Sequence, residues 1–108
     1  DTQALQDYLL RQFPLTQAMA VTVEDITPDA LSLAALLAQN SNHQQTLFGG
    51  SGVTLCILAC WSLLYCRLQA AALAGDIVIQ RQQMDYQRPA SADVWAEAQF
   101  IDEPLATL

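Results

Sequence analysis

The sequence predicts an α+β fold in which an antiparallel sheet wraps around one buried helix. Residues 53–73 are apolar on every side, so a helix formed there must be enclosed by other elements. Segments with strand patterns occur in pairs before and after this helix, and turn residues join the members of each pair. The chain has 108 residues, the length of one domain. We therefore expect residues 1–108 to form a single domain.

The first half of the chain predicts a helix followed by a hairpin. Residues 2–13 carry apolar side chains at helical spacing, and Pro14 ends this pattern. Residues 19–26 and 30–38 suit strands, and the Thr-Pro-Asp sequence between them is typical of a turn. The second strand is apolar on both faces, which places it inside the sheet or against a partner. Residues 40–52 form a loop, first polar and then rich in glycine, that leads to the buried helix.

The buried helix and two further strands make up the second half. One apolar stripe of the helix is formed by Val53, Ile57, Trp61, Leu64 and Leu68. Residues 77–88 predict a long strand. We expect a bulge near residues 80–83, because the apolar side chains stand at odd positions before these residues and at even positions after them. Residues 94–101 predict a strand whose buried face carries Val94, Ala96, Ala98 and Phe100. No strand follows to complete the sheet, so we expect either one more hairpin beyond this sequence or a partner over the open edge.

Charge excludes a nucleic-acid-binding surface that follows phosphates. The net charge is -7, with eleven acidic residues against four arginines and no lysine. The fixed cations that could hold a phosphate group are therefore Arg11, Arg67, Arg81 and Arg88.

The cysteines predict neither disulfides nor a metal site. Cys56, Cys60 and Cys66 lie in one apolar segment without a Cys-x-x-Cys spacing, and His43 is the single histidine. We expect buried cysteines, no metal, no cofactor and a reducing, cytoplasmic location.

A membrane span must be considered because no charged residue lies between Asp29 and Arg67. The densely apolar part, residues 53–66, is shorter than the roughly 20 residues that a bilayer requires. No basic cluster flanks it to set an orientation. We therefore expect a core helix and no membrane partner.

One combination of motifs resembles a bacterial family. It consists of N-x-N-H-x-x-T-x-F-G-G-S at residues 40–51, the apolar helix with Trp61, G-D-I-V at 75–78 and D-Y-x-x-P at 85–89. These motifs are similar to the thioesterase-like domain at the C-terminus of YiiD proteins, a branch of the hotdog superfamily. The resemblance implies a hotdog fold, a homodimer with adjoining sheets, and thioesters of acyl-coenzyme A or acyl-carrier protein as ligands. Related domains are called thioesterases, and some are assigned as malonyl-carrier-protein decarboxylases in fatty-acid initiation.

The predicted site lies where the loop enters the central helix. Gly49, Gly50 and Ser51 would present backbone N–H groups at the positive end of the helix dipole, where a thioester carbonyl oxygen could bind. Such donors stabilise negative charge on that oxygen, both in hydrolysis and in decarboxylation to an enolate. The glycines could instead serve only to let a tight loop enter the core.

Polar residues of the loop are further candidates. Asn40, Asn42 and His43 are candidate catalytic residues together with Gly50, since amides can hold a carbonyl and histidine can act as acid or base. A solvated role for His43 is the alternative. The candidate substrate-binding residues are Thr46, Phe48, Gly49, Ser51 and Tyr86, although Thr46 could also cap the helix.

The central helix lacks the carboxylate that hotdog hydrolases of the better-understood type usually carry. Residues 53–60 offer only Thr54, Cys56 and Cys60, and a buried cysteine without an activating partner favours a packing role. The superfamily favours thioester hydrolysis, which we predict first. Malonyl-thioester decarboxylation needs no water-activating base and is the alternative, and a non-catalytic acyl-binding domain is the third hypothesis.

Overall fold

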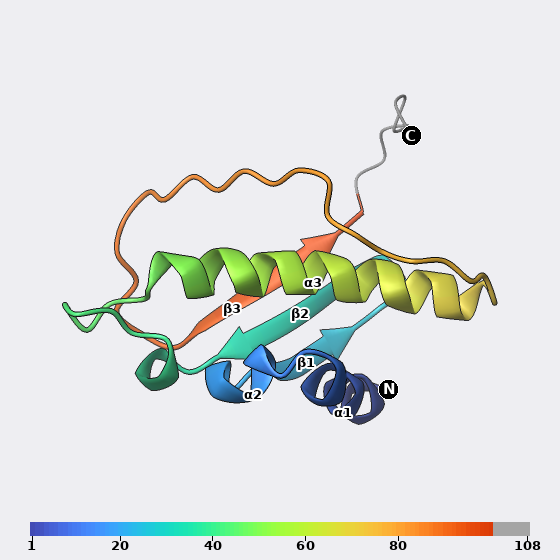
Figure 1. The fold of residues 1–108 in the computed structure, drawn as a ribbon, viewed down its shortest axis with the longest axis horizontal. Helices are drawn as coiled ribbons and strands as arrows, with labels where there is room; N and C mark the ends of the chain where they lie inside the picture. Colours follow the sequence, from blue (N-terminus) through green and yellow to red (C-terminus); the bar gives the residue numbers. More distant parts are fainter. Residues whose placement is uncertain (101–108) are drawn as a thin grey trace.

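The computed structural model describes residues 1–100, which form a three-stranded antiparallel sheet with one long helix lying across it (Figure 1). The two short N-terminal helices lie beside the sheet, next to its first strand. In chain order the elements are α1 (Thr2–Gln12), α2 (Leu15–Met19), β1 (Thr22–Ile26), β2 (Ala30–Ala35), the 3-10 helix η1 (Leu37–Gln39), α3 (Gly49–Ala70) and β3 (Val94–Gln99). The α+β class and the hairpin before the long helix are confirmed.

The sheet has the order β1-β2-β3, so β2 is its central strand as its apolar sequence predicts. Leu33 lies fully buried in the middle of β2, opposite Val23 of β1 and Ala96 of β3. The first strand is shorter than predicted because residues up to Met19 form α2, and Ala20 in the left-handed conformation then turns the chain into β1. A register shift between Val23 and Asp25 places a bulge in β1.

The long helix α3 packs one face on the sheet and leaves the other face open. The buried face is formed by Gly52, Leu55, Leu58, Ala59, Ser62 and Leu63. On the opposite face Cys56, Cys60 and Leu64 are exposed. The expectations that α3 would be enclosed and that these cysteines would be buried are therefore wrong for the part of the chain that the structure describes, because three strands cover only one face of a helix.

Residues 77–88 do not form the predicted strand. They are extended and mostly exposed, and they arch along α3 without joining the sheet (Figure 1). Alternation of apolar and polar side chains favours an extended backbone, but a strand also needs a neighbour for its N–H and C=O groups. No such neighbour pairs with this segment within residues 1–100, so the predicted bulge near residues 80–83 is also absent there.

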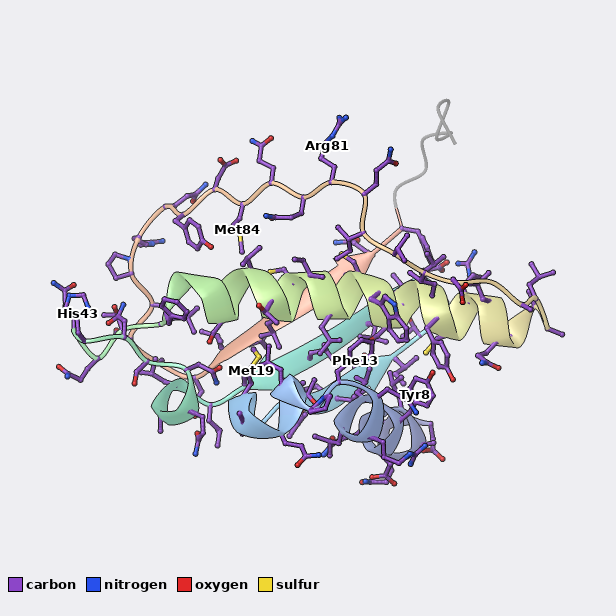
Figure 2. The ribbon with its side chains drawn as sticks, in the orientation of Figure 1. Tyr8, Phe13, Met19, His43, Arg81 and Met84 are labelled. Carbon is purple, nitrogen blue, oxygen red and sulfur yellow. The ribbon has the colours of Figure 1, made fainter. Side chains whose placement is uncertain are left out.

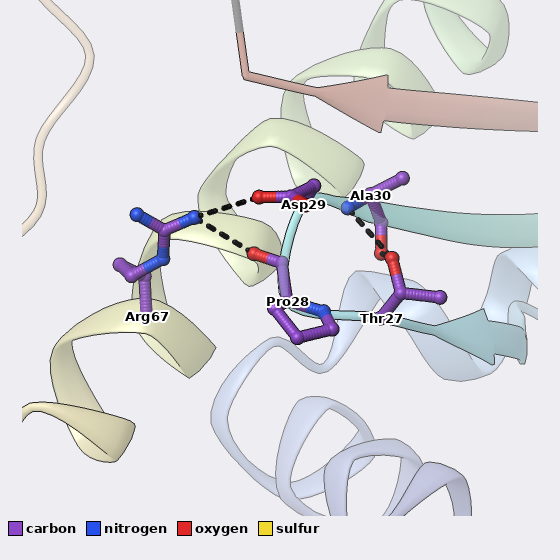
Figure 3. A network of polar contacts seen from close by, with 5 residues as sticks. All are labelled: Thr27, Pro28, Asp29, Ala30 and Arg67. Carbon is purple, nitrogen blue, oxygen red and sulfur yellow. Dashed lines mark hydrogen bonds and ion pairs between the residues drawn. The ribbon is translucent and has the colours of Figure 1, made fainter.

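Strand β3 confirms residues 94–99 of the predicted last strand, and Ile101 lies outside the described residues. Ala96 and Ala98 are buried as predicted, whereas Phe100 is 40% exposed. The guanidinium of Arg67 lies 4.3 Å from the centre of the Phe100 ring. Arg67 also donates to Pro28 O at 2.9 Å and pairs with Asp29 at 3.3 Å, which ties α3 to the hairpin turn (Figure 3).

Contacts among four aromatic rings connect α1 with α3. Tyr8 of α1 stacks on Tyr65 of α3 with ring centroids 4.7 Å apart, and Trp61 stacks on Tyr65 at 5.1 Å. Phe13 meets Trp61 edge to face at 4.9 Å. The side chains of Tyr8 and Phe13 point from the N-terminal segment toward α3 (Figure 2). The predicted amphipathic helix at residues 2–13 is thus confirmed to within one residue.

By length and composition, α3 is able to cross a membrane, since it has 22 residues and is strongly apolar. It is longer than the apolar segment expected from the sequence because its first turn begins at Gly49. One third of its most apolar window, 33%, is buried against the rest of the chain. The core helix of a soluble protein passes the same length test, so this helix is weak evidence for a membrane span.

Candidate functional site

The start of α3 carries free backbone donors. Phe48 precedes the helix in an extended conformation and no side chain caps this end. Ser51 N and Gly52 N both donate to Phe48 O, at 3.0 and 3.1 Å. The N–H groups of Gly49 and Gly50 have no acceptor within residues 1–100. Two of the three predicted amides are therefore available to a ligand, whereas that of Ser51 is already engaged.

Two aromatic rings flank these amides. A Cβ on Gly50 would lie 2.5 Å from the ring of Phe48, so only glycine fits there without moving that ring. A Cβ on Gly49 would lie 3.3 Å from the ring of Tyr86, whose hydroxyl donates to Gly49 O at 2.8 Å. Phe48 and Tyr86 are both more than half exposed, so the two rings border an open site. The structure thus brings Phe48, Gly49, Gly50 and Tyr86 together.

The loop before the helix is held by Asn42. Its Nδ2 donates to Thr46 Oγ1 at 2.9 Å, and its Oδ1 accepts from Gln44 N at 2.8 Å and Thr46 N at 3.2 Å. These hydrogen bonds occupy the polar groups of Asn42 and Thr46 inside their own loop. Neither residue donates to or accepts from Gly50.

Asn40 lies beneath this loop and anchors it. Its side chain is buried, and Nδ2 donates to Met19 O at 2.8 Å and Leu36 O at 2.7 Å. Its backbone carbonyl accepts from Phe48 N at 2.7 Å. Asn40 Oδ1 has no partner among the described residues. These contacts link the end of α2, the end of β2 and the start of α3, which is a structural role.

His43 lies at the outer tip of the loop, exposed and turned away from α3 (Figure 2). The imidazole makes no hydrogen bond with any of residues 1–100. Asn40, Asn42 and His43 therefore do not converge on the Gly50 amide within one chain, and their catalytic roles stay predictions. The burial of Asn40 could not be foreseen, because one of its two acceptors, Met19 O, lies 21 residues away in sequence.

No activated nucleophile stands on α3. The helix carries no carboxylate, and its thiols at Cys56 and Cys60 lie on the open face. Burial raises the pKa of the Cys56 thiol, and repulsion from Cys60 raises it further. A raised pKa keeps most of this thiol protonated at neutral pH, so it is a weak nucleophile. Within residues 1–100, no three His, Cys, Asp or Glu side chains gather as metal ligands do.

An apolar cavity of about 310 Å³ lies between the open face of α3 and residues 77–84. None of the predicted site residues lines it. The α3 side is formed by Val53, Cys56, Ile57, Cys60, Trp61 and Leu64. Four of these six belong to the apolar stripe evident in the sequence, which was the available signal for the cavity.

A single long helix packed across an antiparallel sheet is the arrangement of a thioesterase-like hotdog protein. The chain matches the family described as "Putative thioesterase (yiiD_Cterm)" over residues 2–106, and it belongs to that family. The resemblance in the loop and helix motifs is thereby confirmed.

Solved structures agree with this fold. A putative thioesterase from Shewanella oneidensis superposes with a TM-score of 0.88 at 26% identity, over 97% of this chain and 73% of that one. A protein of unknown function from Chlorobaculum tepidum superposes with a TM-score of 0.88 at 30% identity. The match covers 94% of this chain and 63% of that one. A "Probable Thioesterase" from Pseudomonas aeruginosa superposes with a TM-score of 0.78 at 20% identity, over 94% of this chain and 66% of that one. This match supports the fold alone. The chain spans less than two thirds of the length of the last two.

Proposed function

We propose that this protein hydrolyses short- to medium-chain acyl thioesters of coenzyme A or of a carrier protein, with the amides of Gly49 and Gly50 as the oxyanion hole. The observation that carries this proposal is the pair of N–H groups without an acceptor at the start of a 22-residue helix. The helix dipole adds positive potential at that end. Family membership supplies the thioester substrate class.

In this reaction a water oxygen adds to the thioester carbon, and the carbonyl oxygen becomes negatively charged as the tetrahedral intermediate forms. Two amides pointing at that oxygen stabilise the charge without needing to reorganise. The carbon–sulfur bond then breaks, and the thiolate leaves and takes up a proton. The helix itself offers no base to activate the water. Because His43 of the same chain is turned away from α3, we assign that task to a group from a second copy of the chain.

We infer that the protein is a homodimer in which residues 77–88 of two copies lie together. This segment is already extended, and its backbone groups lack sheet partners within residues 1–100. Apolar side chains stand exposed on it, with Val78 82% and Ile79 51% accessible. Pairing two such segments would bury these side chains. Sedimentation analysis tests this directly: a dimer is expected, and a monomer at micromolar concentration would contradict it.

Decarboxylation of a malonyl thioester is the second candidate, favoured by the lack of a carboxylate on α3. The bond between the α-carbon and the carboxylate breaks, carbon dioxide leaves, and the electron pair moves into the thioester enolate. The same amides would stabilise the enolate oxygen, and protonation at the α-carbon then gives the acetyl thioester. This route uses no attacking water.

One assay separates these functions. The protein is incubated with acetyl-, decanoyl- and malonyl-coenzyme A and with the matching carrier-protein forms, and free thiol and carbon dioxide are measured separately. Thiol release without carbon dioxide supports hydrolysis. Carbon dioxide release with an intact acetyl thioester supports decarboxylation and contradicts hydrolysis. Saturable binding without either product would leave the third hypothesis, an acyl-binding domain.

A further inference from the structure

Tyr86 connects the arching segment with the start of α3. Within the described part of the chain, three hydrogen bonds join residues 77–90 to other elements. The side chain of Trp61 holds one end of the segment, and the backbone N–H of Leu47 holds the other. The third bond is made by the Tyr86 hydroxyl, which donates to Gly49 O at 2.8 Å. The segment therefore places a hydroxyl donor on the first residue of α3.

The carbonyl that Tyr86 binds belongs to the same peptide unit as the N–H of Gly50. This unit is planar, so its C=O and N–H groups can turn only together. Fixing the direction of Gly49 O therefore also fixes the direction of the Gly50 N–H, one of the two free donors. A hydrogen bond to the carbonyl polarises the peptide as well, which makes its N–H a stronger donor.

The first turn of α3 needs such support. Its sequence is Gly-Gly-Ser-Gly, and glycine loses more conformational freedom on folding than any other residue. No side chain caps this end of the helix, and helix ends tend to fray. A donor that moves must be reordered before it can stabilise a developing charge, and this lowers its contribution. The ring of Tyr86 also packs against Gly49, 3.3 Å from the place of a Cβ.

We propose that Tyr86 is a positioning residue, whose hydroxyl holds the peptide between Gly49 and Gly50 and thereby directs the Gly50 N–H at the oxyanion. This inference rests on the proposed function, because it assigns a task beside the same amides. Tyr86 acts through the peptide and not on the reacting atoms. Removing its hydroxyl should therefore weaken stabilisation of the transition state and leave binding of the substrate unchanged.

The first test measures the order of the amide and does not depend on turnover. The full chain is labelled with 15N, and the N–H of Gly50 is followed by NMR in the wild type and two variants. Tyr86→Phe keeps the ring and removes the hydroxyl. Tyr8→Phe is the matched control, because Tyr8 stacks on Tyr65, which lies about 22 Å along α3 from Gly50.

The order parameter of the Gly50 N–H should be about 0.85, the value of a rigid backbone, in the wild type and in Tyr8→Phe. In Tyr86→Phe it should fall toward about 0.6. The 15N resonance of Gly50 should also shift upfield, because the carbonyl of its peptide has lost a donor. An unchanged Gly50 signal in Tyr86→Phe would overturn the proposal. So would an equal change in both variants, since the effect would not be specific to this hydroxyl.

The second test separates a positioning residue from one that binds the substrate. With decanoyl-coenzyme A, Tyr86→Phe should lower kcat roughly two- to ten-fold, the range of one net hydrogen bond, and leave KM unchanged. A raised KM with an unchanged kcat would overturn the proposal, because Tyr86 would then bind the substrate itself. Turnover that is the same in the wild type and Tyr86→Phe would refute the positioning role and keep the hydrolysis. A Gly50 signal that depends on Tyr86, in a wild type without turnover, would refute the hydrolysis and support the positioning of the amide.

Discussion

Replacing Gly49 by proline removes one of the two proposed oxyanion donors with little strain. Gly49 is the first residue of α3, where proline is favoured because its fixed φ suits the helix and its missing N–H has no helical partner. The residue before proline must be extended, and Phe48 already is, with φ -66 and ψ 129. Gly49→Ala is the matched control, because it adds the same Cβ near Tyr86 but keeps the N–H group.

The expected magnitude follows from the chemistry of the site. Loss of one oxyanion donor lowers kcat by about 100- to 1,000-fold, or about 3 to 4 kcal/mol. The fold should tolerate both variants, because a proline compatible with its backbone changes stability by only about 0.4 to 1 kcal/mol. Gly49→Pro is therefore expected to lose activity at least 100-fold relative to Gly49→Ala.

The measurement is kcat for thiol release from decanoyl-coenzyme A, with urea unfolding of each variant alongside. Both variants place a Cβ against the ring of Tyr86, so the comparison between them tests the missing amide N–H. Equal kcat values for the two variants, with both folded, would refute the assignment of the Gly49 amide to the oxyanion hole. If the two equal kcat values also lie below that of the wild type, the position of Tyr86 is the feature that matters.

Three further outcomes are expected from other parts of the chain. Asn40→Ala should destabilise the protein by about 2 kcal/mol in urea unfolding, because two backbone carbonyls lose their donor; an unchanged midpoint would show that Asn40 is no anchor. Leu33→Ala should cost about 2 to 5 kcal/mol in the same assay, since the side chain is fully buried in the central strand, and a loss below about 1 kcal/mol would contradict that packing. Burial raises the pKa of Cys56, so its alkylation at pH 8 should be slower than that of a free thiol. Its alkylation rate should also still increase at pH values where the rate of the free thiol has become constant. Coincident pH profiles of the two rates would contradict the raised pKa.

The local periodicities of the sequence determined most elements. Apolar spacing was enough to locate α1, the β1–β2 hairpin and β3 to within a few residues, because each pattern reports a face that a neighbour covers. The unbroken apolar character of α3 identified it as the central helix. The glycines of the loop motif correctly marked the junction with free amides, since a helix start leaves its first N–H groups unpaired whatever surrounds it.

Only the tertiary structure decided which polar groups remain available for chemistry. Asn40 looked like a ligand-binding amide, yet its partners lie at Met19 and Leu36, and the Ser51 amide turns back to Phe48. The Met19 partner depends on how distant elements pack, which sequence spacing does not encode, whereas the Ser51 amide bonds within the first turn of α3.

The same limit explains residues 77–88, whose alternating pattern predicts an extended chain but not the strand that must lie beside it. It also explains the apolar cavity beside α3. A helix that is apolar all round must be covered, but only the packed structure shows that the sheet takes one face and leaves the other beside an apolar cavity. The sequence by itself thus determined most of the elements and the amide junction, and tertiary packing decided which surfaces and donors stay open to a substrate.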